Sequence, residues 1–156
     1  TKPWPDLAGR LIPGGHVLPV RIYFVDTDFS GVVYHGSYIR FMERGRSDFV
    51  RLLGVAHAGL DAGEHGEQLA FAVHRIHIDF FRPARIDDLV EVTTMVKAVT
   101  GARLILTQTV TRDGERLTEA EVTIVLITRE GRARRIPDSL REALHDAAVA
   151  TGVAPA

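Results

Sequence analysis

Cysteine is absent from the 156 residues of this chain. Without a thiol, the chain forms no disulfide, binds no metal through a thiolate and offers no cysteine nucleophile. Proteins without disulfides are usual in reducing compartments, so we expect a cytoplasmic location. Any chemistry of this protein depends on its other side chains or on its backbone.

Long apolar runs and a large net charge are also missing. No stretch approaches the roughly 18 consecutive apolar residues of a membrane helix, and residues 1–13 lack the apolar core of a signal peptide. The formal net charge is −1, so no overall field attracts nucleic acid or an anionic membrane surface. The short basic cluster at residues 132–135 is typical of a solvated edge. We therefore expect no integral membrane segment and no nucleic-acid partner.

Several catalytic and metal-binding motifs do not occur. The seven histidines include no H-E-x-x-H arrangement, and the spacing of His74 and His77 would point them to opposite faces of a strand. The sequence has no G-x-S-x-G, G-x-G-x-x-G or P-loop motif. These absences argue against a metal site, a nucleophile-elbow serine hydrolase and a nucleotide-binding motif.

The apolar patterns predict both helices and strands. A helix over about residues 36–53 carries one apolar stripe at helical spacing. Ser139 begins a short C-terminal helix with capping-box spacing, and residues 57–67 are ambiguous between a short helix and a loop. Alternating or β-branched runs predict strands at residues 17–25, 69–81, 89–99, 103–112 and 117–128.

These elements fit a single α+β domain over residues 1–156, with an irregular N-terminal arm at residues 1–15 and a loose tail at residues 147–156. The last four predicted strands can pair by hairpins into an antiparallel sheet, and Asp113-Gly114 is a strong hairpin signal. The long helix can cover one face of that sheet.

The most informative segment runs from Tyr23 to Tyr38. Asp26 and Asp28 flank a threonine where a strand ends, and the long helix starts a few residues later. A helix N-terminus presents unpaired N–H groups that can polarise a carbonyl, and a nearby carboxylate can attack that carbonyl or activate water. An aspartate in such a turn is more often an Asx-turn or cap residue. The residues alone leave both readings open.

A dense pattern that begins in this segment and continues into the predicted long helix resembles a known family. The pattern comprises Val25-Asp26-Thr27-Asp28, Val33-Tyr34-His35, and then Tyr38, Phe41, Glu43, Arg44 and Arg46. It resembles the signature of the 4-hydroxybenzoyl-CoA thioesterase family, in particular its Tol–Pal-associated acyl-CoA thioesterase subfamily. That resemblance implies a hotdog fold, a curved antiparallel sheet of about five strands around one long central helix, here with a short C-terminal helix. Ser37, where the family often has Asn, and Gly45, where Ala is common, depart from the pattern.

The resemblance also implies a reaction, the hydrolysis of an acyl-CoA thioester without a metal or an organic cofactor. By position, the catalytic carboxylate falls on Asp28 and the carbonyl-polarising backbone N–H on His35. Family members commonly place this site between two subunits of a dimer, often within a tetramer, so we expect a homo-oligomer. Residues expected to contact the substrate are Gly31, Val33, Tyr34, Tyr38 and Arg103. Arg103 is a candidate for binding the phosphates of coenzyme A, and Arg82 and Arg85 are the alternatives.

Two other functions remain open for the same scaffold. One is hydrolysis of acyl groups carried by an acyl carrier protein (ACP), and the other is non-catalytic binding of acyl-CoA. Asp28 favours an enzyme, because a binder needs no carboxylate at the thioester. The sequence does not distinguish a nucleophilic carboxylate from a general base, and it does not indicate the acyl chain.

Overall fold

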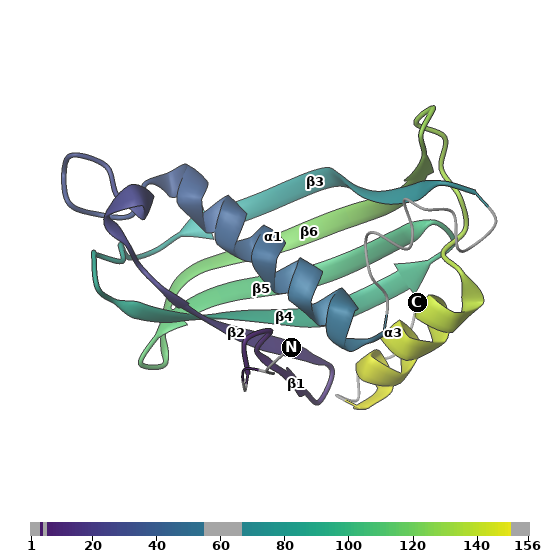
Figure 1. Cartoon of the computed structure of the whole chain (residues 1–156), viewed down its shortest axis with the longest axis horizontal. Coiled ribbons are helices and arrows are strands. Elements are labelled where there is room, and N and C mark those ends of the chain that lie inside the picture. The colour runs from purple at the N-terminus through teal and green to yellow at the C-terminus, as the bar shows by residue number, and fades with distance from the viewer. Residues whose placement is uncertain (1–3, 5, 55–66, 151–156) are drawn as a thin grey trace.

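The computed structural model describes residue 4 and residues 6–54 and 67–150 (Figure 1). Residues 57–66, for which the sequence was ambiguous, lie outside the described residues. The elements are, in chain order, β1 (Arg10–Ile12), β2 (Gly15–Arg21), η1 (Phe24–Asp26, a 3-10 helix), α1 (His35–Leu52), β3 (Leu69–Phe80), β4 (Leu89–Thr100), β5 (Arg103–Arg112), β6 (Glu115–Thr128) and α3 (Asp138–Ala150).

The strands form one antiparallel sheet in the order β1-β2-β4-β5-β6-β3. With α1 across one face (Figure 1), this is the α+β hotdog arrangement predicted from the sequence. β5 and β6 meet at Asp113-Gly114, where both residues have positive φ, as the hairpin signal predicted. The expected hairpin between β3 and β4 is wrong, because residues 81–88 carry the chain across the end of the sheet and β4 pairs with β2.

The N-terminal arm contributes a strand that the sequence did not predict. β1 pairs with β2 from Arg10 opposite Val17 to Ile12 opposite Gly15, so residues 1–15 are not wholly irregular. Three residues are too few for an alternating pattern to appear. The sheet therefore has six strands in the described residues, where about five were expected.

β2 ends at Arg21, earlier than the predicted end at Val25. The carboxylate of Asp26 accepts the N–H of Tyr23 at 2.9 Å, and the N–H of Asp26 donates to the Tyr23 carbonyl at 3.0 Å. Such local bonding competes with the strand ladder. The chain therefore turns into η1 before it reaches α1.

Helix α1 buries the apolar stripe predicted from the sequence. Phe41, Met42 and Phe49 are each at most 2% exposed. Gly45 explains how closely the helix approaches the sheet, because a Cβ at this position would lie 3.0 Å from Cγ1 of Val92 and 3.2 Å from Oγ1 of Thr94. The departure from the family pattern at Gly45 thus permits close packing of α1 on β4.

A polar cluster lies inside this apolar layer. Gln108, which is fully buried, donates from Nε2 to the Met42 carbonyl and to Oγ1 of Thr94, both at 2.9 Å. Its Oε1 accepts Nη1 of Arg46 at 2.9 Å. Burial lowers the pKa of the Arg46 guanidinium, while the nearby charge of Glu43 acts in the opposite direction. The cluster satisfies polar groups that would otherwise be costly to bury.

The C-terminal helix α3 contacts β4 and buries Leu140 and Leu144 against the core. It begins at Asp138, next to the predicted start at Ser139. The helix continues to Ala150, so the expectation of a loose tail from residue 147 is wrong for residues 147–150, and residues 151–156 lie outside the described part. In the described residues, neither α1 nor α3 combines the length and apolar character needed to span a bilayer.

Candidate functional site

Asp28 lies in an exposed loop, residues 27–34, that connects η1 to α1 and is called the Asp28 loop below. The N–H of Asp28 donates to the Val32 carbonyl at 3.0 Å, and the N–H of Gly31 donates to the Asp28 carbonyl at 3.0 Å. Gly31 has a φ of 88°, a left-handed conformation that glycine adopts without strain. The sequence therefore folds the loop into a tight turn that carries an aspartate.

The carboxylate of Asp28 is held by Ser30. Its Oδ1 accepts the backbone N–H of Ser30 at 2.8 Å and also the Ser30 hydroxyl. These hydrogen bonds lower the pKa of Asp28 below its ordinary value, and the charge of His35 contributes in the same direction. Asp28 is thus an ionised, exposed carboxylate at neutral pH.

Asp26, the other carboxylate of the pair, shapes the loop instead of facing solvent. It is 8% exposed, and its backbone carbonyl accepts the N–H of Tyr34 at 3.0 Å and Oγ of Ser37 at 3.0 Å. Its Oδ1 lies 3.4 Å from Nη2 of Arg40. Ser37 therefore donates a hydrogen bond at the place where the family often has Asn.

Helix α1 begins at His35, directly after the Asp28 loop. Tyr34 occupies the N-cap position, and among the described residues it makes no side-chain hydrogen bond that caps the helix. Ser37 donates its N–H to the Tyr34 carbonyl at 2.8 Å. The preceding N–H groups of the first turn have no acceptor within the helix itself, so they can bind an oxygen atom that develops negative charge.

The residues predicted for the site line two separate hollows at this end of α1. Asp28 and Tyr34 lie in a hollow of about 310 Å³ together with Ser37 and Arg40. The second hollow, of about 290 Å³, is lined by Val33, His35, Tyr38, Phe80, Phe81, Arg82 and Pro83. Asp28 and His35 are nevertheless close enough for the imidazole to affect the carboxylate. Gly31 lies in open space, because apart from its two chain neighbours no residue has an atom within 4 Å of the position that a Cβ would take.

Tyr38 is buried, at 3% exposed, and its ring packs edge-on against Phe80. Its hydroxyl oxygen accepts the N–H of Ala84 at 3.0 Å. Burial raises the pKa of the Tyr38 phenol, although the hydrogen bond from Ala84 acts in the opposite direction. Tyr38 therefore lines the second hollow with its ring, while its hydroxyl oxygen is already hydrogen-bonded to Ala84.

Arg103 does not lie near Asp28 within one chain. Its backbone is opposite Thr100, at the β4–β5 hairpin. The Asp28 loop follows β2, whose last residue, Arg21, is opposite Leu89 at the other end of β4. Arg103 and the Asp28 loop are thus at opposite ends of the sheet.

Sequence reasoning missed Arg40 and Ser30. Ser30 follows Asp28 by two positions, a spacing typical of an aspartate turn, and this signal could have been used. Arg40 carried no comparable signal. In the described residues no three His, Asp or Glu side chains gather in a way that could hold a metal ion.

Comparison with known proteins identifies a family profile that matches most of the chain. The profile described as thioesterase-like superfamily matches residues 22–144. The acyl-CoA thioester hydrolase YbgC of Escherichia coli O6:H1 is 38% identical over 110 residues, which cover 70% of this chain and 79% of that protein. The acyl-CoA thioesterase YbgC of Haemophilus influenzae is 37% identical over 117 residues, covering 75% of this chain and 84% of that protein.

Solved structures share the same architecture. A probable thioesterase from Bartonella henselae superposes with a TM-score of 0.77 at 44% identity, covering 79% of this chain and 99% of that one. A 4-hydroxybenzoyl CoA thioesterase mutant complexed with 4-hydroxybenzoyl CoA gives a TM-score of 0.76 at 17% identity, covering 84% and 99% of the two chains. At that identity the second likeness concerns the fold alone.

Proposed function

Since this chain belongs to the thioesterase-like superfamily, we propose that it hydrolyses acyl-CoA thioesters to a free acid and coenzyme A. Family membership is joined by one structural observation that supports this reaction. The carboxylate of Asp28 is exposed and ionised in a tight loop, and the uncapped start of α1 at His35 follows directly. The names of the curated relatives agree with this chemistry.

In the proposed reaction, the backbone N–H of His35 donates a hydrogen bond to the thioester carbonyl oxygen and stabilises the negative charge that develops there. Asp28 either attacks the carbonyl carbon or removes a proton from an attacking water. In both routes the carbon–sulfur bond breaks and coenzyme A leaves as the thiol after protonation. In the first route, water then hydrolyses the acyl-aspartyl anhydride and regenerates Asp28.

The lowered pKa of Asp28 suits either role, because both require the ionised carboxylate. The proposed reaction uses neither a metal ion nor an organic cofactor, since the carboxylate and the helix N–H supply the nucleophilic or basic group and the charge stabilisation. We assign Gly31, Val33, Tyr34 and Tyr38 to the walls around the thioester. The open backbone at Gly31 and the hollows lined by the other three residues support this assignment.

We further propose that two copies of the chain associate through β3. This strand has 12 residues, pairs only with β6 in the described chain and leaves Val73 and Phe80 nearly half exposed. Beside it, a cavity of about 390 Å³ separates β3 from α1, and exposed Ile39 and Glu43 line its helical side. A second copy would pair the free edge and cover this apolar surface.

Such an oligomer, a dimer or a tetramer, also suits the position of Arg103. Because Arg103 lies far from Asp28 within one chain, it can serve the phosphates of coenzyme A only across a subunit interface. The site is therefore proposed to lie between subunits, in a cytoplasmic enzyme. Size-exclusion chromatography with light scattering should give at least a dimer mass, and Val73→Lys should lower it. A monomeric wild type contradicts this part of the proposal.

The direct test of function is thiol release from a panel of short, long and aromatic acyl-CoAs, with an acyl-ACP included. Asp28→Asn should lower kcat by roughly 10²–10⁴-fold, because the amide is neither a base nor a nucleophile. Asp146→Asn is the matched control, since Asp146 is exposed on α3. Wild type that hydrolyses only acyl-ACP identifies a carrier-protein thioesterase. Binding of acyl-CoA without thiol release, or an active Asp28→Asn, contradicts the mechanism.

A further inference from the structure

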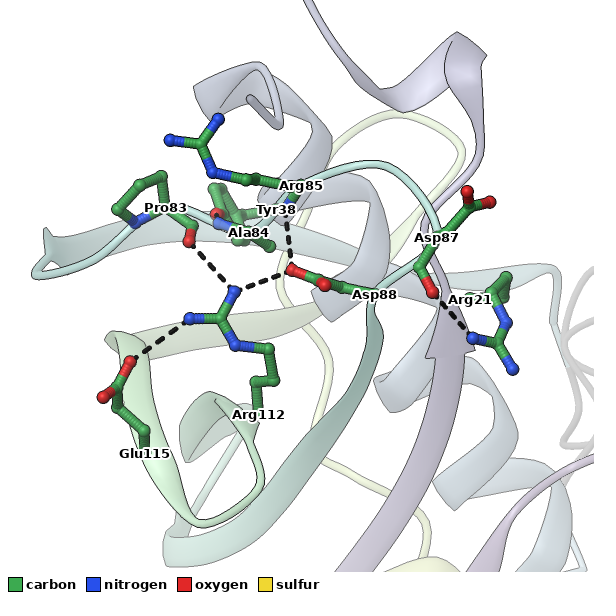
Figure 2. Close-up of polar contacts among 9 residues, drawn as sticks. All are labelled: Arg21, Tyr38, Pro83, Ala84, Arg85, Asp87, Asp88, Arg112 and Glu115. Atoms are coloured by element: carbon green, nitrogen blue, oxygen red, sulfur yellow. Dashed lines mark hydrogen bonds and ion pairs between the residues drawn. The ribbon is translucent and has the colours of Figure 1, made fainter. Parts of the chain in front are cut away.

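We propose that Arg112 and Asp88 are positioning residues for this site and that they act through the backbone of Ala84. The proposal rests on the proposed thioesterase function, which requires Asp28 and the start of α1 to keep fixed positions relative to each other. Both residues belong to a network around residues 83–88, called the supporting segment below (Figure 2).

Ala84 joins the Asp28 loop to α1. Its carbonyl accepts the N–H of Val33 at 2.9 Å, and its own N–H donates to the hydroxyl oxygen of Tyr38 at 3.0 Å. Val33 and Tyr38 lie on either side of His35 along the chain. Because Ala84 is fully buried, water does not compete for these two hydrogen bonds. The backbone of this one residue thus fixes the chain both before and after the proposed N–H donor.

The supporting segment also holds the chain at the entrance to the loop. Ile22, the residue after β2, donates its N–H to the Asp88 carbonyl at 2.9 Å and accepts the N–H of Asp87 at 2.9 Å. Val32 forms a further antiparallel bridge with Arg85. The stretch that carries Asp28 is therefore bound to the supporting segment both before and after Asp28.

The guanidinium of Arg112 connects the two ends of the supporting segment. Nη1 of Arg112 donates to Oδ2 of Asp88 at 2.7 Å and lies 3.3 Å from the Pro83 carbonyl (Figure 2). The same Oδ2 accepts the N–H of Arg85 at 2.9 Å. Nη2 of Arg112 lies 3.3 Å from Oε1 of Glu115, across the β5–β6 hairpin. Arg112 thereby anchors the supporting segment to the end of β5.

This arrangement needs the shape of arginine as well as its charge. The guanidinium presents several N–H groups in a fixed plane, so it contacts Asp88, Pro83 and Glu115 at the same time. A lysine ammonium can keep the ion pair with Asp88, but it cannot span all three acceptors in the same geometry. The side chains of Arg112 and Asp88 are 28% and 26% exposed, so solvent screens the pair only in part.

The first test compares Arg112→Gln and Arg112→Lys with wild type in acyl-CoA hydrolysis, well below the melting temperature. Arg134→Gln is the matched control, because Arg134 forms a surface ion pair with Glu67 at 2.8 Å away from the supporting segment. Arg112→Gln should lower kcat by roughly 10–100-fold with KM changed less than about threefold, since misplacement of reacting groups acts on the chemical step. Arg112→Lys should retain an intermediate kcat, and the control should match wild type.

The second test does not depend on catalysis. Amide hydrogen exchange of Val33 and Ala84, measured by NMR on the full chain, should accelerate about tenfold or more in Arg112→Gln and stay unchanged in Arg134→Gln. If wild type hydrolyses no thioester, the proposed function fails, while the exchange rates still decide whether Arg112 holds the loop. Wild-type kcat in a folded Arg112→Gln, or unchanged exchange at both amides, overturns the positioning role.

Discussion

Replacing Tyr38 by phenylalanine removes one oxygen atom from the junction between α1 and residues 83–88. The phenyl ring keeps its packing against Phe41 and Phe80, whose centroids lie 6.0 and 5.8 Å from that of Tyr38. The N–H of Ala84, however, loses the acceptor that now lies 3.0 Å away. The substitution therefore isolates one buried hydrogen bond from the packing of the side chain.

The expected cost follows from the burial of both partners. Tyr38 is 3% exposed and Ala84 is fully buried, so the freed N–H cannot turn to bulk water. Leaving a buried donor without an acceptor costs about 1–3 kcal/mol. In a domain of this size about 1 kcal/mol corresponds to roughly 2–4 °C, so the melting temperature should fall by roughly 2–12 °C. Differential scanning calorimetry measures this change.

Tyr23→Phe is the matched control, because Tyr23 is 65% exposed and its substitution should change the free energy of unfolding by less than about 0.5 kcal/mol. Amide exchange at Ala84 should also accelerate in Tyr38→Phe. If the two phenylalanine variants melt at the same temperature and Ala84 exchanges as in wild type, the hydrogen bond contributes nothing and the reasoning from burial is refuted.

Three further predictions concern charge and burial. Ser30→Ala removes a hydrogen bond that lowers the pKa of Asp28, so the acid limb of the pH profile of kcat/KM should move to higher pH. If the acid limb does not move, either Ser30 does not lower this pKa or Asp28 is not the catalytic carboxylate. Gln108→Leu leaves the buried Arg46 guanidinium without its acceptor and should destabilise the fold by about 3 kcal/mol in urea unfolding. Burial acts to raise the pKa of Asp88, but hydrogen bonds from Arg85 and Arg112 outweigh burial and lower that pKa. The ionised Asp88 therefore stabilises the fold at pH values above its ordinary pKa of 3.8, and this stabilisation is lost as the pH falls through the lower pKa of the folded state. Asp88→Asn should thus be less stable than wild type at neutral pH, and the difference in melting temperature should close in acid.

The sequence predicted the main elements because their signals are local. The apolar stripe of α1 and the strands β3 to β6 could be read from periodicity, and the Asp113-Gly114 turn from residue types. The pairing of β3 with β6 depends on where residues 81–88 lead the chain, which no periodicity records. The early end of β2 depends on a side-chain hydrogen bond of Asp26 that competes with the ladder.

The candidate site divides in the same way. Asp28 and His35 could be proposed because both lie in one short motif at the start of a helix. Arg112 and Asp88 are 24 positions apart, and nothing in either local sequence indicates that they meet. Arg103 was chosen for its charge, and only the registers of β4 with β5 and with β2 reveal its distance from Asp28. Roles in the proposed reaction remain predictions until the variants are measured.

The two edges of the sheet differ in a way that bears on how the chain avoids uncontrolled assembly. At one edge, β1 has only three residues, so it offers an incoming strand few backbone groups for hydrogen bonding. On the other side β3 offers 12 residues. Two chains that join through β3 about a twofold axis consume the long edge of both, and the short edges left outside do not support further addition. Association by the proposed route would be self-limiting, because it ends in a closed particle, whereas two long edges would permit a fibril.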